Sequence, residues 1–298
     1  MIKEVIGKEN WKKLVLKKSE VLSVIAPVYN TKRLYKIVFG SKLNLKCPQK
    51  FSEKLQWLKL YAYNNNELVT TCCDKYKIRC YLNDNGFGYL LPKLYGVYRK
   101  PEEIEWNILP NKFVIKCNHG SGFNILCNDK NLLDIEKTVK RLNEMLKDDY
   151  WKHYSEVQYK NIDKRIIIEE YLGDNIEAYK FYCFNGDVKF MYVSRALNGE
   201  QDVLLDYYDK DFNHLPIVLK GHINNPEGNI KPSNYGQLVN IATDLSKPFP
   251  FVRVDLYNID NKPYISEMTF VPTGGFVKVG EDKYDKLWGE WLDINCVN

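Results

Sequence analysis

The sequence predicts an α+β fold in which helices are mixed with antiparallel pairs of strands. Two strand pairs carry this prediction: an Asn185-Gly186 turn divides the apolar stretch 179–193, and a polar turn divides the stretches 251–257 and 264–270. The helical segments do not alternate regularly with the strands, which argues against a doubly wound parallel sheet. With 298 residues the chain is long enough for about two domains, or for one domain of two lobes.

Helices are expected in the first part of the chain. Ser52 is expected to cap a helix over 52–63, and a second short helix over 74–82 is expected to end at the polar cluster 83–86. Leu109-Pro110-Asn111 then marks a boundary. The predicted regions are a basic N-terminal segment (1–50), a second region (51–110) and a main part (111–298).

The main part is expected to contain most of the strands. Apolar residues recur at a helical period over 132–146, which predicts one helix there. Elsewhere, bulky and β-branched residues predict strands. The predicted strands and hairpins are 113–117, 123–127, 165–172, 179–193 and 251–270.

Positive charge is concentrated at the start of the chain. Residues 1–50 hold 12 Lys and Arg and three acids, whereas the remainder carries a net charge of −4. The paired lysines stand beside apolar residues, which is typical either of a basic helix facing an anionic membrane or glycan, or of an ordinary solvated helix face. No nucleic-acid-binding motif accompanies the charge, so a nucleic-acid partner is not expected.

A reducing, cytoplasmic setting is expected. The eight cysteines form no Cys-x-x-Cys pair, and the four histidines do not fall at ligand spacing. Cys117, Cys127 and Cys183 lie in apolar segments, where a reduced cysteine packs as a small hydrophobic residue. No apolar run reaches the length of a membrane span, and no apolar signal core precedes the first lysines. Peripheral contact with the inner membrane face through residues 1–50 stays open.

Lys116 lies at the end of the predicted strand 113–117, and Asn118-His119-Gly120-Ser121-Gly122 follow that strand. Glycines let backbone amides approach phosphate oxygens, and the lysine supplies positive charge, so this loop suits a phosphate site. It is not a Walker loop, because no Gly-Lys-Ser/Thr is present and a strand follows in place of a helix. A tight hairpin loop with an exposed lysine is the alternative.

Asp255 and Glu267 are candidate metal ligands on the last hairpin. If its turn is centred near Asn261, Asp255 lies opposite Glu267 and Arg253 lies opposite Thr269. Two carboxylates that close repel each other unless a cation lies between them. Mg²⁺, held by these oxygens and by substrate phosphates, would remove the conflict. A surface hairpin with another register and solvated acids is the alternative.

The strand 166–172 runs into the acids Glu169 and Glu170. Such a strand can link two lobes and offer free backbone groups to a purine, or it can simply be an ordinary strand end. Together, the lysine–glycine loop, this acidic strand end and the late Arg-x-Asp and Glu resemble the ATP-grasp superfamily. The stretches KCNHGSG and EMTFVPTGG make the chain similar to its TupA-like branch, named after teichuronopeptide biosynthesis and found in surface-polysaccharide gene clusters. The resemblance spans roughly residues 40–295.

The resemblance implies an ATP-grasp fold, in which two α+β lobes clamp the nucleotide. They would be a nucleotide-flap lobe (111–172) and a metal-binding lobe (173–298). It also implies roles for individual residues. Arg253 and Lys116 would act on the developing phosphate charge, and Mg²⁺ would be bound by Asp255, Glu267 and Thr269. ATP would be bound by Lys75, Lys116, His119, Gly120, Ser121, Gly122, Glu169, Glu170, Tyr171, Leu172, Glu177 or Asp174, and Lys180.

Two positions depart from the family pattern. Thr269 stands where ATP-grasp enzymes commonly have Asn, although its hydroxyl still offers one neutral oxygen. Ala178 stands where the branch commonly has Asp. Arg195, Gly274 and Gly275 are expected to contact the second substrate, the molecule that reacts with ATP. An ordinary turn at the two glycines is the alternative.

The resemblance implies an ATP- and Mg²⁺-dependent carboxylate–amine ligase. Such an enzyme forms an acyl phosphate and here would modify a surface glycan. The expected partner is an anionic sugar or glycan, either free or carried on a lipid. One alternative is a sugar kinase that uses the same nucleotide site. Another is a non-catalytic glycan-binding protein.

Overall fold

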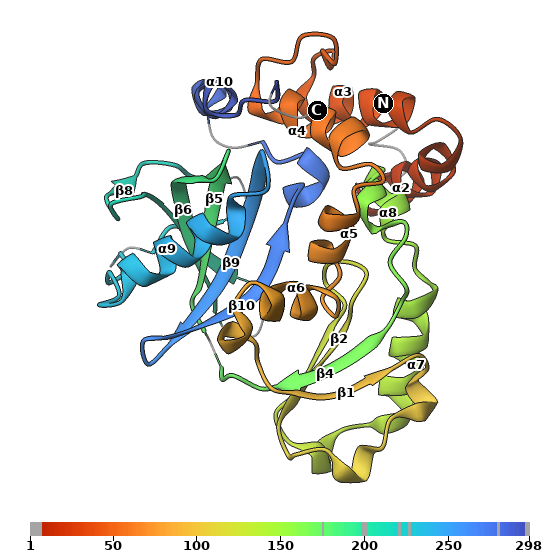
Figure 1. Ribbon diagram of the computed structural model, residues 1–298. Helices are drawn as coiled ribbons and strands as arrows, with labels where there is room; N and C mark the ends of the chain where they lie inside the picture. Colours follow the sequence, from red (N-terminus) through yellow and green to blue (C-terminus); the bar gives the residue numbers. More distant parts are fainter. Residues whose placement is uncertain are drawn as a thin grey trace.

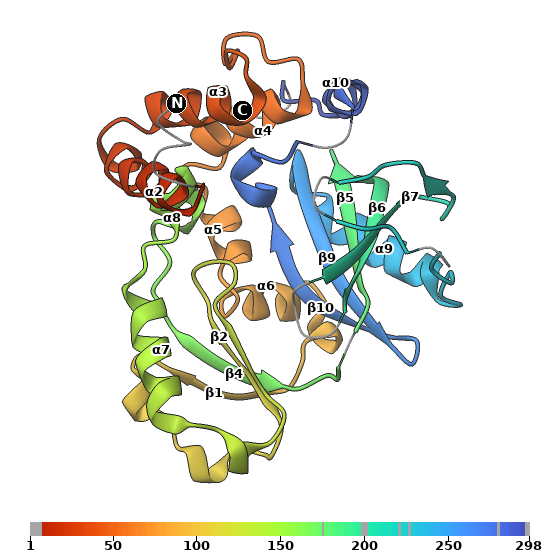
Figure 2. The ribbon, with the colours of Figure 1, turned by 180° about the vertical axis from the view of Figure 1, so that it is seen from behind.

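The computed structural model of the chain describes residues 8–174, 176–197, 202–219, 222–225, 228–278 and 281–295. Two antiparallel sheets, one of four strands and one of six, lie on either side of the short helices α5 (Glu67–Cys73) and α6 (Ile78–Asp84), as Figures 1 and 2 show. The predicted α+β class is confirmed. No described helix has the length and hydropathy needed to cross a membrane.

The four-stranded sheet contains the lysine–glycine loop and the acidic strand end. Its strand order is β1-β4-β2-β3, and every neighbouring pair is antiparallel. Leu142 and Met145 of α7 (Ile135–Lys147) cover one face of the sheet. The four strands are β1 (Leu94–Tyr98), β2 (Phe113–Cys117), β3 (Asn124–Cys127) and β4 (Ile166–Glu170). Strand β1 was not predicted; it lies in the region 51–110 and pairs with β4.

The six-stranded sheet has the order β10-β9-β5-β6-β7-β8. Helix α9 (Tyr235–Ser246) packs on one face. Part of the opposite face is closed by α4 (Phe51–Trp57) and α10 (Asp282–Trp291), through Phe51 and Trp288. The strands are β5 (Ala178–Phe184), β6 (Asp187–Leu197), β7 (Asp202–Asp209), β8 (His214–Leu215), β9 (Phe251–Ile259) and β10 (Lys262–Thr269).

Both predicted hairpins are confirmed. Asn185 and Gly186 have φ angles of 49° and 79°, as a two-residue turn between twisted strands requires. In the second hairpin the turn residues are Asp260 and Asn261, with φ angles of 50° and 60°. A bulge between Ile265 and Glu267 then shifts the pairing by one residue, so that Asp255 faces Glu267 and Arg253 faces Thr269, as predicted.

The N-terminal half is helical, with two corrections. The helix expected to begin after Ser52 begins at Phe51. The Ser52 N–H and hydroxyl both donate to the Asp285 carboxylate at 2.7 Å. Ser52 therefore joins α4 to α10 and does not cap α4. The helix expected over 74–82 is a turn followed by α6. The other helices are α2 (Lys8–Ile25), α3 (Pro27–Phe39), a π-helix (Leu58–Ala62), α8 (Trp151–Tyr154) and the 3₁₀ turns Gly88–Leu90, Pro101–Glu103, Trp106–Ile108, Lys130–Leu132, Val157–Tyr159 and Pro272–Gly275.

The expected apolar packing of three cysteines is confirmed. Seven cysteines are free, and Cys117, Cys127 and Cys183 are buried among apolar side chains. Cys296 lies outside the described residues.

Candidate functional site

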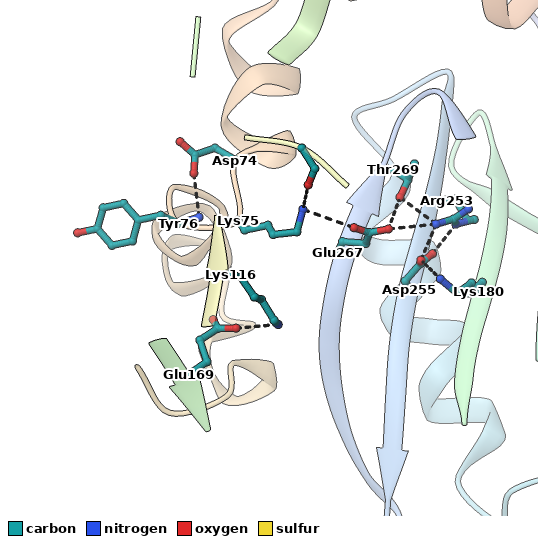
Figure 3. A network of polar contacts seen from close by, with 11 residues as sticks. Asp74, Lys75, Tyr76, Lys116, Glu169, Lys180, Arg253, Asp255, Glu267 and Thr269 are labelled. Atoms are coloured by element: carbon teal, nitrogen blue, oxygen red, sulfur yellow. Dashed lines mark hydrogen bonds and ion pairs between the residues drawn. The ribbon is translucent and has the colours of Figure 1, made fainter. Parts of the chain in front are cut away.

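Three segments that are far apart in the sequence meet between the two sheets (Figure 3). They are the turn between α5 and α6, the loop that follows β2, and the hairpin of β9 and β10. Lys75 connects them: its Nζ donates to the backbone oxygen of Gly120 at 2.5 Å and lies 3.7 Å from Oε2 of Glu267. The structure therefore brings together Lys75, the loop and Glu267, which the sequence analysis assigned to one nucleotide site.

A charged cluster occupies the β9–β10 side of the site. Arg253 donates two hydrogen bonds to the Asp255 carboxylate, from Nε to Oδ1 at 2.6 Å and from Nη2 to Oδ2 at 2.7 Å. Lys180 donates to Oδ2 of Asp255 at 2.7 Å. Glu267 Oε1 accepts from Arg253 at 3.1 Å and from the Thr269 hydroxyl at 3.0 Å. With Lys75, three cations surround two carboxylates, so the cluster is suited to an additional anion.

These charges shift the pKa values of the cluster. Burial alone would raise the pKa of Glu267, but the three neighbouring cations lower it to about 2. Burial opposes the charged form of Lys180, yet Asp255 raises the pKa of Lys180 above its usual range. The pKa of Arg253 is raised for the same reason. Glu267, Lys180 and Arg253 are therefore charged at neutral pH.

The donor chemistry of the cluster fits a magnesium ion held jointly with a nucleotide. Mg²⁺ takes oxygen ligands, commonly one or two carboxylates together with substrate phosphates and water. Asp255 and Glu267 offer carboxylates, and Thr269 offers a hydroxyl. Within the described part of the chain, no three His, Cys, Asp or Glu side chains gather into a metal site. Oxygen atoms of a bound nucleotide would thus have to complete the coordination.

Lys116 lies on the opposite side, in a buried ion pair. Its Nζ is 2.8 Å from Oε2 of Glu169, and Arg79 lies 2.8 Å from Oε1 of the same carboxylate. Burial opposes the charge of Lys116, but Glu169 raises the pKa of the lysine. Two cations thus hold the Glu169 carboxylate, and Glu169 lies within the sheet between Leu94 of β1 and Val114 of β2.

The loop after β2 is buried where it begins, at His119, and exposed at its tip. The His119 side chain is buried, and its Nε2 lies 3.2 Å from the backbone oxygens of Met145 and Asp148. Burial lowers the pKa of His119 to about 4, so the ring is neutral. The ring supports the loop from below, which leaves only the His119 backbone for the predicted phosphate contact. Ser121 and Gly122 are exposed at the tip, and Gly122 has a φ angle of 78°.

The predicted adenine and ribose residues lie on the segment that joins the two sheets. Tyr171 donates its hydroxyl hydrogen to Asp174, and Glu170 accepts from the Lys93 N–H at 3.2 Å. Leu172 lies half-buried in the same segment. Glu177 accepts from the hydroxyl of Tyr179 at 2.8 Å and lies 3.9 Å from Arg195.

The acceptor expectation needs a correction at Gly274 and Gly275. Both are buried, and their backbone oxygens accept hydrogen bonds from Gln56 and Lys59 at 2.8 to 3.1 Å. A Cβ atom on Gly274 would lie 2.7 Å from the Tyr154 side chain. These glycines fasten the turn to the N-terminal helices and do not line an open surface.

A pocket of about 260 Å³ opens instead beside the charged cluster. Arg253 and Lys180 form one side of it, and Thr273, next to the two glycines, also lines it. None of the described lining residues is acidic. The remaining lining residues are Tyr182, Tyr192, Ser194, Leu205, Tyr207, Leu219, His222, Pro272 and Val277.

Several residues of the site were not predicted from the sequence. Arg79 shares Glu169 with Lys116, and the Tyr192 hydroxyl lies 3.3 Å from Nη1 of Arg253. Asn118 donates to Asp74 at 2.8 Å and so holds the loop against the turn that carries Lys75. The alternating pattern of β6 could have indicated Tyr192, since it shares a face with Phe190 and Ser194. No local signal marks Arg79, and Asn118 was predicted only as part of the loop, without its contact to Asp74.

Comparison with solved structures found many similar proteins, among them two ligases and a synthetase. D-alanine–D-alanine ligase from Bacillus anthracis, complexed with ATP, is 18% identical over 67% of this chain and 55% of that chain, with a TM-score of 0.42. L-amino acid ligase from Bacillus licheniformis is 16% identical over 82% and 54%, with a TM-score of 0.44. N5-carboxyaminoimidazole synthetase from Staphylococcus aureus, complexed with ADP, is 14% identical over 75% and 52%, with a TM-score of 0.44.

This chain therefore spans little more than half the length of each of these structures. No curated protein matches it. A family model described as TupA-like ATPgrasp matches residues 53–293, which include both sheets and all three segments of the site. The chain belongs to the TupA-like ATP-grasp family and has the ATP-grasp fold.

Proposed function

We propose that this protein is an ATP- and magnesium-dependent ligase that joins a carboxylate to an amine through an acyl phosphate. The observation that carries the proposal is the cluster of three cations around Asp255 and Glu267, which lies next to a pocket lined by two of the same cations. A nucleoside triphosphate and a carboxylate are both anionic. Their approach requires positive charge at the point where they meet, and Arg253 and Lys180 supply it there.

The reaction has two steps. A carboxylate oxygen of the acceptor attacks the γ-phosphorus of ATP, and the bond from that phosphorus to the bridging oxygen of ADP breaks. An amine then attacks the acyl carbon, phosphate leaves, and the amine nitrogen loses a proton. A bound magnesium ion would screen the phosphate charges. Arg253 and Lys180 would orient the carboxylate, while Lys75 and the loop up to Gly122 would exclude water from the acyl phosphate.

We further propose that the carboxylate belongs to an anionic sugar, such as a uronic acid of a surface glycan. The pocket supports this choice because tyrosine rings can pack against the apolar face of a sugar ring, while Ser194 and Thr273 offer hydroxyls to its hydroxyl groups. The absence of acidic side chains among the described lining residues favours an anionic occupant. Its volume, about 260 Å³, is small for a ligand pocket and suits one ring. The reduced cysteines support a cytoplasmic location.

The test supplies ATP, Mg²⁺ and a uronic acid, with hydroxylamine as the amine. A ligase yields ADP, phosphate and a hydroxamate in equal amounts. A sugar kinase yields ADP and a sugar phosphate, which phosphorus NMR distinguishes. Asp255→Asn should abolish product, whereas Asp244→Asn, a matched change on the surface of α9, should leave the rate unchanged. ADP release that depends on neither the uronic acid nor the amine would overturn the proposal.

A further inference from the structure

Helix α2 buries small polar side chains and exposes large apolar ones, the reverse of an ordinary surface helix. Ser19 and Ser23 are buried, and their hydroxyls donate to the backbone oxygens of His153 and Lys152 at 2.5 and 2.7 Å. By contrast, Val21 is 60% exposed and Ile25 is 71% exposed. Burial of serines alone does not explain why aliphatic residues occupy the outer side.

The exposed apolar residues of α2 form one stripe. Leu14, Val21 and Ile25 are separated by seven and four residues, a spacing that places them on one side of a helix. Val24 lies at the edge of this stripe and is also exposed. The stripe extends over three turns of the helix, with Lys17 and Lys18 between Leu14 and Val21.

Helix α3, which packs against α2, also carries exposed apolar residues. Its Asn30 side chain donates to the Ser19 hydroxyl at 2.7 Å, which fixes α3 against α2. Tyr29 and Ile37 are exposed on α3. A groove of about 710 Å³ runs beside them and is lined by Tyr29, Lys32, Arg33, Lys36, Ile37, Lys42 and Leu43.

Positive charge lies among these apolar residues. Residues 8–43 contain nine Lys and Arg and two acids, although the whole chain has a net charge of only +5. Lys17 and Lys18 are exposed between Leu14 and Val21. Both helices precede the residues 53–293 that match the family model, so the ATP-grasp fold does not account for this surface.

We propose that the outer face of α2 and α3 docks on the surface of an anionic lipid bilayer. The aliphatic side chains would enter the boundary between headgroups and acyl chains, and the lysines would contact anionic headgroups. An anionic bilayer would therefore interact with both the aliphatic side chains and the lysines of this face. A second copy of the chain would oppose one strongly positive face with another, and a nucleic acid would leave the aliphatic side chains in water.

The test measures co-sedimentation of the full chain with vesicles, in the absence of nucleotide. One vesicle preparation is phosphatidylcholine with about one third phosphatidylglycerol, and the other is phosphatidylcholine alone. We expect binding to the anionic vesicles only. The double change Lys17→Gln with Lys18→Gln should lower the partition coefficient about thirtyfold. The double change Val21→Ser with Ile25→Ser should lower it about tenfold or more.

Ile108→Ser with Leu132→Ser is the matched control, because these side chains are 69% and 83% exposed but lie in the four-stranded lobe. This variant should bind vesicles like the unchanged chain, and thermal unfolding checks that each variant is folded. Three results would overturn the proposal: equal binding to both vesicle types, no binding, or equal losses in the control and the α2 variants. A dimer in light scattering that Val21→Ser with Ile25→Ser abolishes would also overturn it. Since no nucleotide is used, the outcome is independent of the proposed ligase activity.

Discussion

Replacement of Glu267 by Gln probes the charged cluster directly. The three cations around Glu267 lower its pKa from 4.5 to about 2, after burial has opposed them. Since one pKa unit corresponds to about 1.4 kcal/mol, the ionised carboxylate contributes at most roughly 3 kcal/mol to stability at neutral pH. Its side chain is 26% exposed, so solvent reduces this figure. We expect Glu267→Gln to lower the free energy of unfolding by roughly 2 to 3 kcal/mol at pH 7.

The pH dependence of this loss gives the stricter test. A depressed carboxyl pKa stabilises the folded state fully above the unfolded value of 4.5, and this stabilisation is lost as the pH falls toward 2. The difference between the two proteins in urea unfolding should therefore shrink below pH 4.5. Glu281→Gln is the control, because Glu281 is 69% exposed and pairs with the exposed Lys283. A Glu267→Gln loss at pH 7 no larger than that of the control would refute the electrostatic reasoning.

Three further predictions concern the loop and its supports. His119 has a pKa lowered to about 4 by burial, so stability should fall as the pH drops from 6.5 toward 4, and His119→Gln should flatten that part of the urea-unfolding profile. Gly120→Ala would place a Cβ atom 2.7 Å from the Tyr150 ring, and it should lower stability in thermal unfolding by about 1 to 3 kcal/mol. In Gly122→Ala the new Cβ atom has no neighbour within 4 Å, so the change should cost about 1 kcal/mol through the φ angle alone. Equal losses of stability in the two variants would contradict the predicted clash at Gly120. Lys75→Met removes the link to the Gly120 oxygen, and we expect nucleotide affinity in calorimetry to fall about tenfold or more; unchanged affinity would place Lys75 outside the site.

Local signals in the sequence predicted much of the fold. The Asn185-Gly186 pair predicted its hairpin because both residues tolerate the positive φ angles that the turn requires. The pairing of Asp255 with Glu267 was predicted from an assumed turn near Asn261. The turn begins one residue earlier, and the bulge before Glu267 compensates. The observed register thus depends on the position of the turn and on the bulge together, and a β-bulge has no dependable sequence signature.

Contacts between distant segments could not be predicted in the same way. The partner of Ser52 is Asp285, on a helix at the other end of the chain, and this contact makes Ser52 an interior residue of α4. Lys59 is fully buried because the backbone oxygens of Tyr154 and Gly274 accept its hydrogens. Neither partner is visible from the sequence around the residue. Strand β1 is short and half-buried, and no alternating pattern distinguishes it.

The central claim is that Asp255 and Glu267 hold a magnesium nucleotide among three cations. Titration calorimetry with a non-hydrolysable ATP analogue, with and without Mg²⁺, measures this most directly. We predict binding of one nucleotide per chain that requires Mg²⁺ and is strongly weakened by Glu267→Gln. No heat of binding with Mg²⁺ present, or equal affinity without Mg²⁺ and in the Glu267→Gln variant, would contradict the claim.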